Sequence, residues 1–506
     1  MLNFIDNFLN KITMYRLVFY ILIGLLSIAV ILSFVGVLHY NPIGIVYSTL
    51  LLMIFALISN KVIAWIFKVP VNFESAYITA FILALIITPP ESSQYISIVP
   101  FLALAAGTAM ASKYLVNIGK KHLFNPAAFA VVITAVTVGK YASWWIGTQS
   151  MLIFVVIAGL MMIRKLREFD LGVAFLAAAI LGTAALTFGN GHVATTVWKG
   201  ISESPLLFFA AIMLTEPLTM PPNRSKRILY GILVGILIIP QAKFGAYSLT
   251  PEWALLIGNL FSYAISPKGR HVFTLNTIKK AGDAAFDFVF KSDRPFAFQP
   301  GQYMEWTLGQ TKTDSRGNRR YFTIASSPTE KDTILGVKFY EKPSTFKQTL
   351  RAMQPGQSLI GSQLAGDFIM PKDKSQKLVF IAGGIGITPF RSMVKFMMDT
   401  NEKRDVVLLY SNRTEQEIAY REIFDEAQTK LGIKTVHTIT DDVSPNWKGY
   451  TGFINKEMIL KEIPDYKDRM YYISGSHGMV TAFKTMLRDL GVPRSKIVTD
   501  FFPGLA

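Results

Sequence analysis

The chain has 506 residues, 51% of which are hydrophobic, and its mean hydropathy of +0.36 is too high for an ordinary soluble protein. It has no cysteine, which excludes disulfides, thiolate nucleophiles and the usual cysteine-ligated iron–sulfur clusters. The formal net charge is +17, but no basic run with interleaved aromatic residues accompanies it, so we expect no nucleic-acid binding.

Charged residues are unevenly distributed along the chain. Residues 1–266 hold 16 Lys or Arg and 8 Asp or Glu, whereas the remaining 240 residues hold 35 and 26. A long segment this poor in charge is typical of a protein that crosses a lipid bilayer, and a charge-rich remainder is typical of a water-facing globule. The sequence therefore predicts a transmembrane domain over residues 1–266.

Ten apolar runs divide this first part. They lie near residues 15–38, 43–60, 74–89, 94–112, 123–139, 150–163, 171–188, 204–215, 228–242 and 249–265. A helix that spans the hydrocarbon core takes about 20 residues, so the run at 204–215 is short, and short runs can be half-helices that line a site. We predict a polytopic α-helical membrane domain of about ten spans.

Loop charge predicts the orientation of this domain. If the N-terminus is cytoplasmic, the inner segments hold 13 Lys or Arg and the outer loops hold only Lys140, Lys199 and Lys243. The chain is then a multi-pass protein of the cell membrane, and its last span ends near Ile265 on the cytoplasmic side. The residues before Met14 lack a small-residue cleavage site, so we interpret them as a cytoplasmic leader.

Proline beside polar residues marks two of the span ends. One is Asn125-Pro126, and the other is Thr215-Glu216-Pro217. Proline at a span end breaks the helix and frees backbone groups that need a partner, so each segment could border a ligand. Two ordinary helix caps would explain the same residues, and their chemistry does not decide between these interpretations.

These segments resemble a known family. Asn-Pro-Ala-Ala at 125–128, and Thr-Glu-Pro-Leu-Thr at 215–219 followed by Tyr-Gly-Ile-Leu-Val-Gly at 230–235, are similar to the D subunit of the Rnf complex and the B subunit of the sodium-pumping NADH:quinone oxidoreductase. The resemblance covers residues 40–265 and includes the ten spans. It implies that FMN binds in the membrane domain, near Asn125, Pro126, Thr215, Glu216 and Pro217.

In that family, an FMN is esterified through its phosphate to a threonine, which implies a flavin transferase as a partner. The matching stretch here ends in Ala194-Thr195, which fits the family motif. Gly189, His192 and Val193 replace the Asp, the Ser or Thr and the Gly of that motif. Thr195 is therefore the candidate attachment residue, while a non-covalent FMN and a plain glycine-rich outer turn stay open as alternatives.

A Pro/Gly/basic stretch, Ser266–Arg270, separates the two parts of the chain. Beyond it, short alternating apolar patterns predict a small antiparallel β-barrel over residues 267–372. Arg320-Tyr321-Phe322-Thr323 falls on one of its strands, and residues two apart on a strand share a face. A cation for a pyrophosphate, a ring for an isoalloxazine and a hydroxyl for its reactive edge suit a flavin dinucleotide, although an ordinary surface strand would also explain this pattern.

Residues 373–506 predict an α/β domain with a parallel sheet. A buried strand ends in a glycine-rich turn with Gly383, Gly384, Gly386, Thr388 and Pro389, and an apolar helix follows. Such a turn lets the backbone approach a nucleotide. Two later strands end at Asn412-Arg413 and at Ser474-Gly475, close to Met479. Ligands of parallel sheets bind beyond the carboxyl ends of the strands, so we expect these residues to meet there.

Residues 270–506 are similar to the ferredoxin–NADP reductase family. The family's Arg-x-Tyr-Ser motif corresponds to Arg320–Thr323, and its nicotinamide-nucleotide motif corresponds to the turn at 383–388. The resemblance implies bound FAD and NAD(P)H, and it implies ligand contacts by Val337, Lys338, Ser344, Thr345 and Phe502. The family's Cys near the hydride-transfer position is Ser474 here. Arg413 could contact a 2′-phosphate or cap a helix, so NADH and NADPH stay open.

The two parts together predict an NAD(P)H-dependent flavoprotein oxidoreductase. Electrons would pass from cytoplasmic NAD(P)H through FAD to FMN in the membrane domain, and then to a quinone or another outer-face acceptor. No metal site is expected. Coupling to Na⁺ transport stays open, because the acidic residues of the membrane part all fall at span ends.

Two other functions are compatible with this arrangement. A haem-based transmembrane reductase of the ferric-reductase type needs histidine pairs within spans, but the first part has only His39, His122 and His192, near span ends. A membrane module that binds a flavin or a vitamin for transport, fused to a reductase, is the second alternative.

Overall fold

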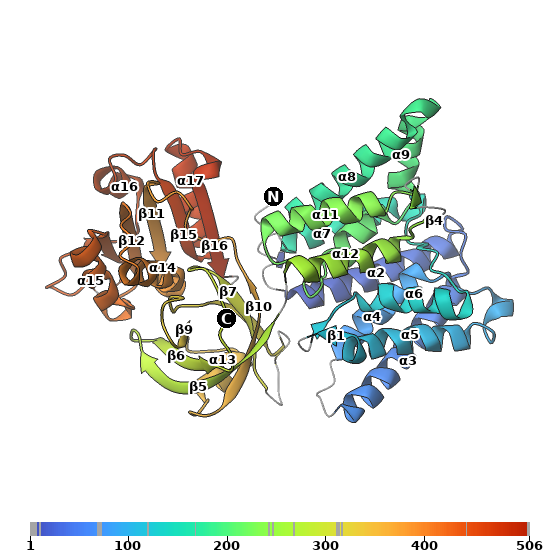
Figure 1. Ribbon diagram of the computed structural model, residues 1–506, viewed down its shortest axis with the longest axis horizontal. Coiled ribbons are helices and arrows are strands. Elements are labelled where there is room, and N and C mark those ends of the chain that lie inside the picture. The colour runs from blue at the N-terminus through green and yellow to red at the C-terminus, as the bar shows by residue number, and fades with distance from the viewer. Residues whose placement is uncertain are drawn as a thin grey trace. The chain divides into compact units, whose positions relative to one another are not determined.

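The structure is a computed structural model of the chain. It describes residues 8–9, 12–67, 73–118, 121–166, 168–240, 243–244, 247–266, 269–309, 314, 317–441 and 443–502. The chain forms two compact units, Met1–Lys268 and Gly269–Ala506, the first mainly helical and the second built on two sheets (Figure 1). Most of the predicted leader, residues 1–7 and 10–11, lies outside the described residues.

The first unit is a set of apolar helices. Its principal helices are α2 (Met14–Phe34), α3 (Pro42–Ile66), α4 (Phe73–Ile86), α5 (Val99–Leu115), α6 (Pro126–Val138), α7 (Leu152–Leu166), α8 (Phe169–Thr187), α9 (Val193–Ser202), α11 (Arg224–Leu237) and α12 (Pro251–Ile265). Short pieces join them: α10 (Leu206–Phe208), the π-helix η4 (Phe209–Met213), the hairpin of β1 (Asn117–Ile118) and β2 (Lys121–His122), and the hairpin of β3 (Lys243–Phe244) and β4 (Tyr247–Ser248).

The predicted count of ten spans is not confirmed. Within the described residues, four helical segments are long and apolar enough to cross a membrane: Met14–Phe34, Pro42–Ile66, Gln149–Leu166 and Phe169–Thr187. Three more apolar helices, α4, α5 and α6, have only 14, 17 and 13 residues. Proline at the start of α6 and at the start of α12 fixes where these helices begin, which shortens them relative to the apolar runs.

The outer faces of these helices are apolar. Large side chains such as Phe34, Trp65 and Leu181 are 69%, 79% and 68% exposed. Exposed apolar surface on this scale marks a surface that is covered by lipid or by another apolar partner. The exposed apolar faces of these helices are therefore those expected of a membrane protein.

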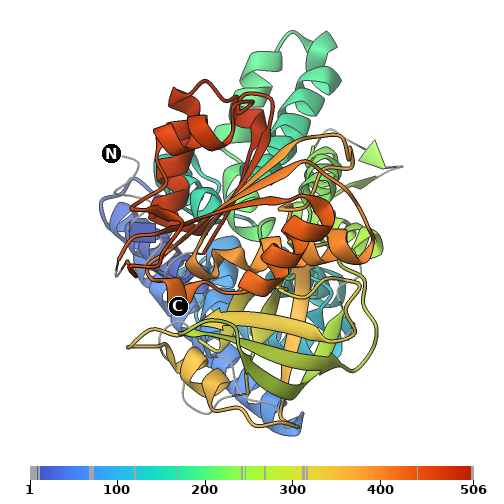
Figure 2. The same ribbon diagram turned by 90° about the vertical axis from the view of Figure 1, so that its left-hand side faces the viewer.

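An antiparallel sheet opens the second unit. Its strands are β5 (Arg270–Lys280), β6 (Ala285–Ser292), β7 (Tyr303–Thr307), β8 (Arg319–Thr323), β9 (Thr333–Lys338) and β10 (Ser358–Ala365), in the order β8-β7-β10-β5-β6-β9. The sheet is curled (Figure 2). Its core includes the aromatic side chains of Phe273, Phe290 and Trp306. A short helix, α13 (Thr345–Arg351), lies between β9 and β10 in the chain.

A parallel sheet completes the second unit. Its strands are β11 (Leu378–Gly383), β12 (Val406–Asn412), β13 (Lys434–Ile439), β14 (Tyr450–Thr451), β15 (Met470–Ser476) and β16 (Ile497–Phe502), in the order β14-β13-β12-β11-β15-β16. The covering helices are α14 (Thr388–Asp399), α15 (Arg421–Leu431), α16 (Lys456–Glu462) and α17 (His477–Asp489). Residues 378–382 of β11 are buried on both faces, as in a central parallel strand.

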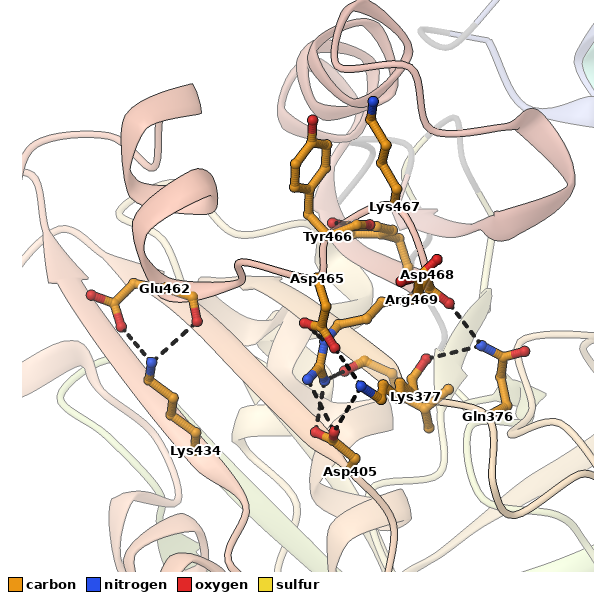
Figure 3. Close-up of polar contacts among 12 residues, drawn as sticks. Gln376, Lys377, Asp405, Lys434, Glu462, Asp465, Tyr466, Lys467, Asp468 and Arg469 are labelled. Carbon is orange, nitrogen blue, oxygen red and sulfur yellow. Dashed lines mark hydrogen bonds and ion pairs between the residues drawn. The ribbon is translucent and has the colours of Figure 1, made fainter.

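An ion-pair network fixes the amino ends of three parallel strands (Figure 3). Arg469, just before β15, forms two hydrogen bonds of 2.8 and 3.0 Å to the carboxylate of Asp405, just before β12. Arg469 also contacts Asp465 at 2.6 Å, and Lys377, just before β11, contacts Asp465 at 2.7 Å. The two-pronged geometry of arginine makes this network specific, so it stabilises the register of neighbouring strands at the edge opposite to the predicted ligand site.

Candidate functional site

The flavin motif predicted from the sequence lies on β8, an edge strand. Arg320 and Phe322 share one face of it, and both approach the ring of Phe346 on α13: the guanidinium carbon is 5.3 Å from the ring centroid, and the two rings are 5.9 Å apart. Tyr321 points to the other face, where its hydroxyl donates a hydrogen bond of 2.9 Å to Glu305. The alternation expected of a strand thus separates Tyr321 from the other two side chains.

A carboxylate lies between Arg320 and the start of α13. Asp314 accepts hydrogen bonds from Arg320 Nη2 at 3.4 Å and from the backbone N–H of Thr345 at 3.2 Å, and its own N–H donates to Thr345 Oγ1 at 3.1 Å. Ser344 caps the helix by accepting from Lys347 N–H at 3.3 Å. The Asp314 carboxylate is therefore held by one guanidinium and one backbone N–H, which are donors of the kind that bind a pyrophosphate.

Thr323 carries a hydroxyl without a partner. Its side chain is 2% exposed, and Oγ1 makes no hydrogen bond to any described residue. A buried hydroxyl that forms no hydrogen bond lowers the free energy of unfolding unless a ligand supplies the missing partner. The fit of the site to a flavin thus rests on this hydroxyl and on the anion position at Arg320 and Thr345.

Val337 and Lys338 on β9 have other contacts. The side chain of Val337 belongs to the core of the curled sheet, so only its backbone is available to a ligand. The ammonium of Lys338 lies 2.8 Å from the carboxylate of Glu417, in the short helix η6 (Glu415–Glu417), and both side chains are largely buried. Lys338 therefore connects the two sheets in this structure.

The glycine turn predicted to bind a nucleotide lies between β11 and α14, as the short helix η5 (Gly384–Ile387). A Cβ atom at Gly383 would clash with Met479 Sδ, and one at Gly386 would lie 2.5 Å from the carbonyl oxygen of Ser474. Gly384 has a φ of +52°, which favours glycine. Thr388 Oγ1 donates to Ile385 O at 3.1 Å, and Pro389 lies in the first turn of α14.

The three strand ends meet as predicted for a parallel sheet. Ala382 is paired with Ser474 on one side, and Gly383 is paired with Ser411, next to Asn412, on the other. Ser474 is fully buried, and its Oγ has no hydrogen-bond partner among the residues that the structure describes. Gly475 packs against Met479 in the following turn. This edge therefore combines small residues, which permit close approach, with an unsatisfied hydroxyl.

Arg413 and Phe502 complete the predicted set. Arg413 lies just after β12, and its Nε donates to Asp441 at 3.0 Å, with both side chains substantially exposed. The backbone of Phe502 continues β16 opposite Ser476, but its side chain lies outside what the structure describes. A ribose bound beyond β12 would therefore meet an arginine and a carboxylate together.

Sequence reasoning missed a group of charged residues between the two sheets. Arg391 on α14 is 6% exposed and forms a two-pronged ion pair with Glu330, with 2.9 Å between Nη2 and Oε1. Tyr420 donates a hydrogen bond to Asp287 on β6, and burial raises the pKa of that carboxyl above its ordinary value. The signal that could have found Arg391 is its position on the apolar face of a predicted helix.

The two proline-containing segments of the membrane unit are close to each other. His122 Nε2 lies 2.9 Å from Glu216 Oε1, and Thr219 Oγ1 lies 3.3 Å from the other oxygen of that carboxylate. Pro217 lies in the turn that begins at Glu216, and Thr215 donates to the carbonyl of Ala211 at 2.7 Å. The segment Thr215–Thr219, which follows the π-helix, therefore lies next to the residues that lead into α6.

Asn125 caps α6 and connects it to α12. Its Oδ1 accepts from the N–H groups of Ala127 and Ala128, both at 3.1 Å, and Pro126 occupies the first helical turn. Its own N–H donates to Asn259 Oδ1 at 2.9 Å, and Asn259 donates to the Tyr230 hydroxyl at 3.2 Å. The capping interpretation of Asn125 is thus correct, and the cap is also part of a buried polar chain.

Thr195 lies in the first turn of α9. It is exposed, and its hydroxyl donates to the carbonyl of His192 at 2.9 Å. The hydroxyl is accessible, and only a local hydrogen bond holds it.

Comparison with known proteins gives two separate family matches. Residues 133–268 match the NQR2, RnfD, RnfE family, and residues 380–485 match the oxidoreductase NAD-binding domain. Both resemblances predicted from the sequence are therefore confirmed.

Individual relatives match less than half of the chain. The glycine betaine monooxygenase reductase subunit of Chromohalobacter salexigens is 27% identical over 241 residues, covering 46% of this chain and 64% of that protein. The F subunit of the Na(+)-translocating NADH-quinone reductase of Yersinia pestis is 33% identical over 168 residues, covering 32% of this chain and 41% of that protein. This chain thus spans less than two thirds of either relative.

Among solved structures, the cytochrome P450 reductase GcoB of Amycolatopsis matches with a TM-score of 0.43 at 19% identity, covering 47% of this chain and 72% of that one. The chain thus joins a segment that matches the NQR2, RnfD, RnfE family to a segment that matches the oxidoreductase NAD-binding domain.

Proposed function

We propose that this protein is a membrane-bound NAD(P)H oxidoreductase that passes electrons from cytoplasmic NAD(P)H, through FAD, to FMN in the membrane domain and on to a quinone or another acceptor. A bound flavin accepts the hydride of NAD(P)H and can release its two electrons one at a time. The proposed domains are the membrane domain at 1–266, the FAD domain at 267–372 and the NAD(P) domain at 373–506.

One observation carries the reductase part of this proposal. Arg391 Nη1 donates a hydrogen bond of 3.0 Å to the carbonyl of Ala325. Ala325 lies two residues after Thr323, the proposed flavin contact, and Arg391 lies three residues after Thr388, the end of the proposed nucleotide turn. The two predicted ligand sites are therefore held next to each other, as transfer between two cofactors requires.

Several of the predicted site residues have a proposed role. Arg320 and Thr345 hold the pyrophosphate of FAD, Phe322 borders its ring, and the Thr323 hydroxyl donates to its reactive edge. The turn at 383–388 and Ser474 hold the nicotinamide nucleotide, and Asn412 and Arg413 contact its ribose. Thr323 and Ser474 offer hydroxyls that the structure leaves available, whereas Arg320 and Arg413 are held against the carboxylates of Asp314 and Asp441.

The membrane part of the proposal rests on the family match and on the polar cluster at Glu216. We propose about ten spans with the reductase unit on the cytoplasmic side. FMN would bind near Asn125, Pro126, Thr215, Glu216 and Pro217, and a second FMN would be attached at Thr195 by a flavin transferase. The exposed Thr195 hydroxyl is consistent with access by such an enzyme.

Reconstituted protein tests this function. Proteoliposomes with the reductase unit outward should oxidise NADH and reduce a lipid-soluble quinone in a one-to-one ratio. Ferricyanide, which is reduced one electron at a time, serves as an acceptor that bypasses the membrane part. If the protein reduces ferricyanide but does not reduce the quinone, the membrane path is contradicted. If it oxidises neither NADH nor NADPH, the whole proposal is contradicted. A haem absorption band in the purified protein would favour a ferric-reductase type of path instead.

A further inference from the structure

Helix α14 forms hydrogen bonds to the segment that follows β8, and these bonds are spread over most of the length of the helix. Besides the bond from Arg391 to Ala325, Ser392 Oγ donates to the carbonyl of Ser326 at 2.7 Å. About two helical turns beyond these contacts, at the end of α14, Asp399 accepts a hydrogen bond of 2.5 Å from Thr329 Oγ1. The residues of this segment from Ala325 to Ser327 are nearly fully buried, so the contacts to Ala325 and Ser326 are made away from water, whereas Thr329 is exposed.

The ion pair between Arg391 and Glu330 closes this segment into a loop. Both Nη atoms of Arg391 contact the Glu330 carboxylate, which also accepts from the N–H of Ser327 at 2.6 Å. Two-pronged contacts of arginine fix orientation as well as distance. A lysine at position 391 would offer a single point of contact and could not hold Ala325 and Glu330 in the same way.

A second connection supports the same arginine. The guanidinium carbon of Arg391 lies 5.6 Å from the ring centroid of Tyr420, whose hydroxyl donates to Asp287 on β6. Tyr420 has a φ of +60°, a conformation that side chains other than glycine adopt at a cost. A Cβ atom at Gly336 on β9 would lie 2.5 Å from the Tyr420 hydroxyl, so the two sheets are in close contact here.

We propose that Arg391 is a positioning residue, which sets the approach of Thr323 to the nucleotide turn and thereby the geometry of hydride transfer. The inference rests on the proposed function. With both cofactors bound, a hydride would pass from the nicotinamide to the flavin, so that NADH would become NAD⁺ and the flavin would gain two electrons and one proton. The rate of such a step is sensitive to displacements of about an ångström or less. Arg391 connects the segment that follows Thr323 to α14, the helix that follows the nucleotide turn.

Arg391→Met in the full-length purified protein tests this inference. Methionine keeps a long apolar side chain but removes every donor. We expect backbone amide exchange in residues 324–330 to rise about tenfold or more in the flavin-free protein, because the loop loses its connection to α14. In the flavin-loaded protein we expect kcat with ferricyanide to fall roughly 10- to 100-fold, with a larger primary isotope effect from NADH deuterated at C4.

Arg488→Met is the matched control, because it makes the same change of an arginine to a methionine. Arg488 is exposed and lies in the last turn of α17, outside α14 and outside residues 324–330. This variant should leave both the amide exchange and the isotope effect unchanged. Glu330→Gln removes the charge but keeps the Arg391 bond to Ala325, so it should produce the same changes at reduced size, and it serves if Arg391→Met does not fold.

Unchanged exchange in residues 324–330 would overturn the inference, and so would faster exchange with an unchanged kcat and isotope effect. The failure of the proposed function would look different. In that case the wild-type protein would not oxidise NADH or NADPH, while the amide exchange would still respond to Arg391→Met.

Discussion

The Asp314 carboxylate lies 3.4 Å from the guanidinium of Arg320 and also accepts from the N–H of Thr345. An anionic side chain of the protein therefore lies in the position where we place the pyrophosphate of FAD. Binding of FAD would have to displace it, and the displaced carboxylate would then face a ligand of the same charge.

Asp314→Asn should strengthen FAD binding. Removing the charge ends the competition for Arg320, and we expect Kd to fall roughly 5- to 10-fold, which corresponds to about 1 kcal/mol. A fluorescence titration of the flavin-free protein measures this. Asp283→Asn is the control, because Asp283 is exposed and pairs with Lys280. Weaker FAD binding in Asp314→Asn would mean that the carboxylate orders the site rather than competing for it.

Thr323→Val should affect the stability of the flavin-free protein and of the FAD-bound protein differently. The buried hydroxyl has no partner within the described chain, so its removal should leave Tm of the flavin-free protein unchanged or slightly raised. With FAD bound, the same change should lower stability by about 1 kcal/mol, since a hydrogen bond to the ligand is lost. Thermal unfolding with and without FAD measures both, and equal effects in the two states would contradict a contact with FAD.

Asp441 should disfavour NADPH. Its carboxylate pairs with Arg413 beyond the end of β12, where we place the ribose, so a 2′-phosphate would meet a negative charge. Asp441→Asn should therefore raise kcat/KM for NADPH several-fold and change the value for NADH little. If Arg413→Ala lowers kcat/KM for both nucleotides equally, Arg413 does not distinguish them.

The ion network at the amino ends of the strands predicts a specific acid sensitivity. The hydrogen bonds and charges of Arg469 and Lys377 lower the pKa of Asp465 from its ordinary value near 3.8 to about 2. Because the folded-state pKa is the lower one, the stability that Asp465 contributes is present above about pH 4 and is lost as the pH falls to about 2. Asp465→Asn should flatten the stability curve in that range, and an unchanged slope would contradict the network.

The sequence predicted those features that depend on local pattern. The strand ending at Gly383 and the one ending at Ser474 follow from apolar runs bounded by small residues, and a parallel sheet brings such ends together. The division into a membrane and a soluble part follows from charge alone. Each of these predictions needed only neighbouring residues in the chain.

The features that it missed are contacts between distant side chains. Arg391 and Glu330 are 61 residues apart in the chain, and His122 and Glu216 are 94 apart, so no local period links them. The prediction of about ten spans is not confirmed by helix length, because proline starts α6 and a π-helix follows α10, which gives shorter elements than the apolar runs suggest.

The flavin content of the purified full-length protein tests the central claim most directly. FAD and FMN released by acid would be quantified beside a denaturing gel viewed under ultraviolet light, with Thr195→Ala run next to the wild type. We predict one FAD per chain, released FMN, and a fluorescent band that is lost in Thr195→Ala. FAD alone, with no FMN either released or attached, would leave the membrane unit without an electron carrier and would contradict the proposed path.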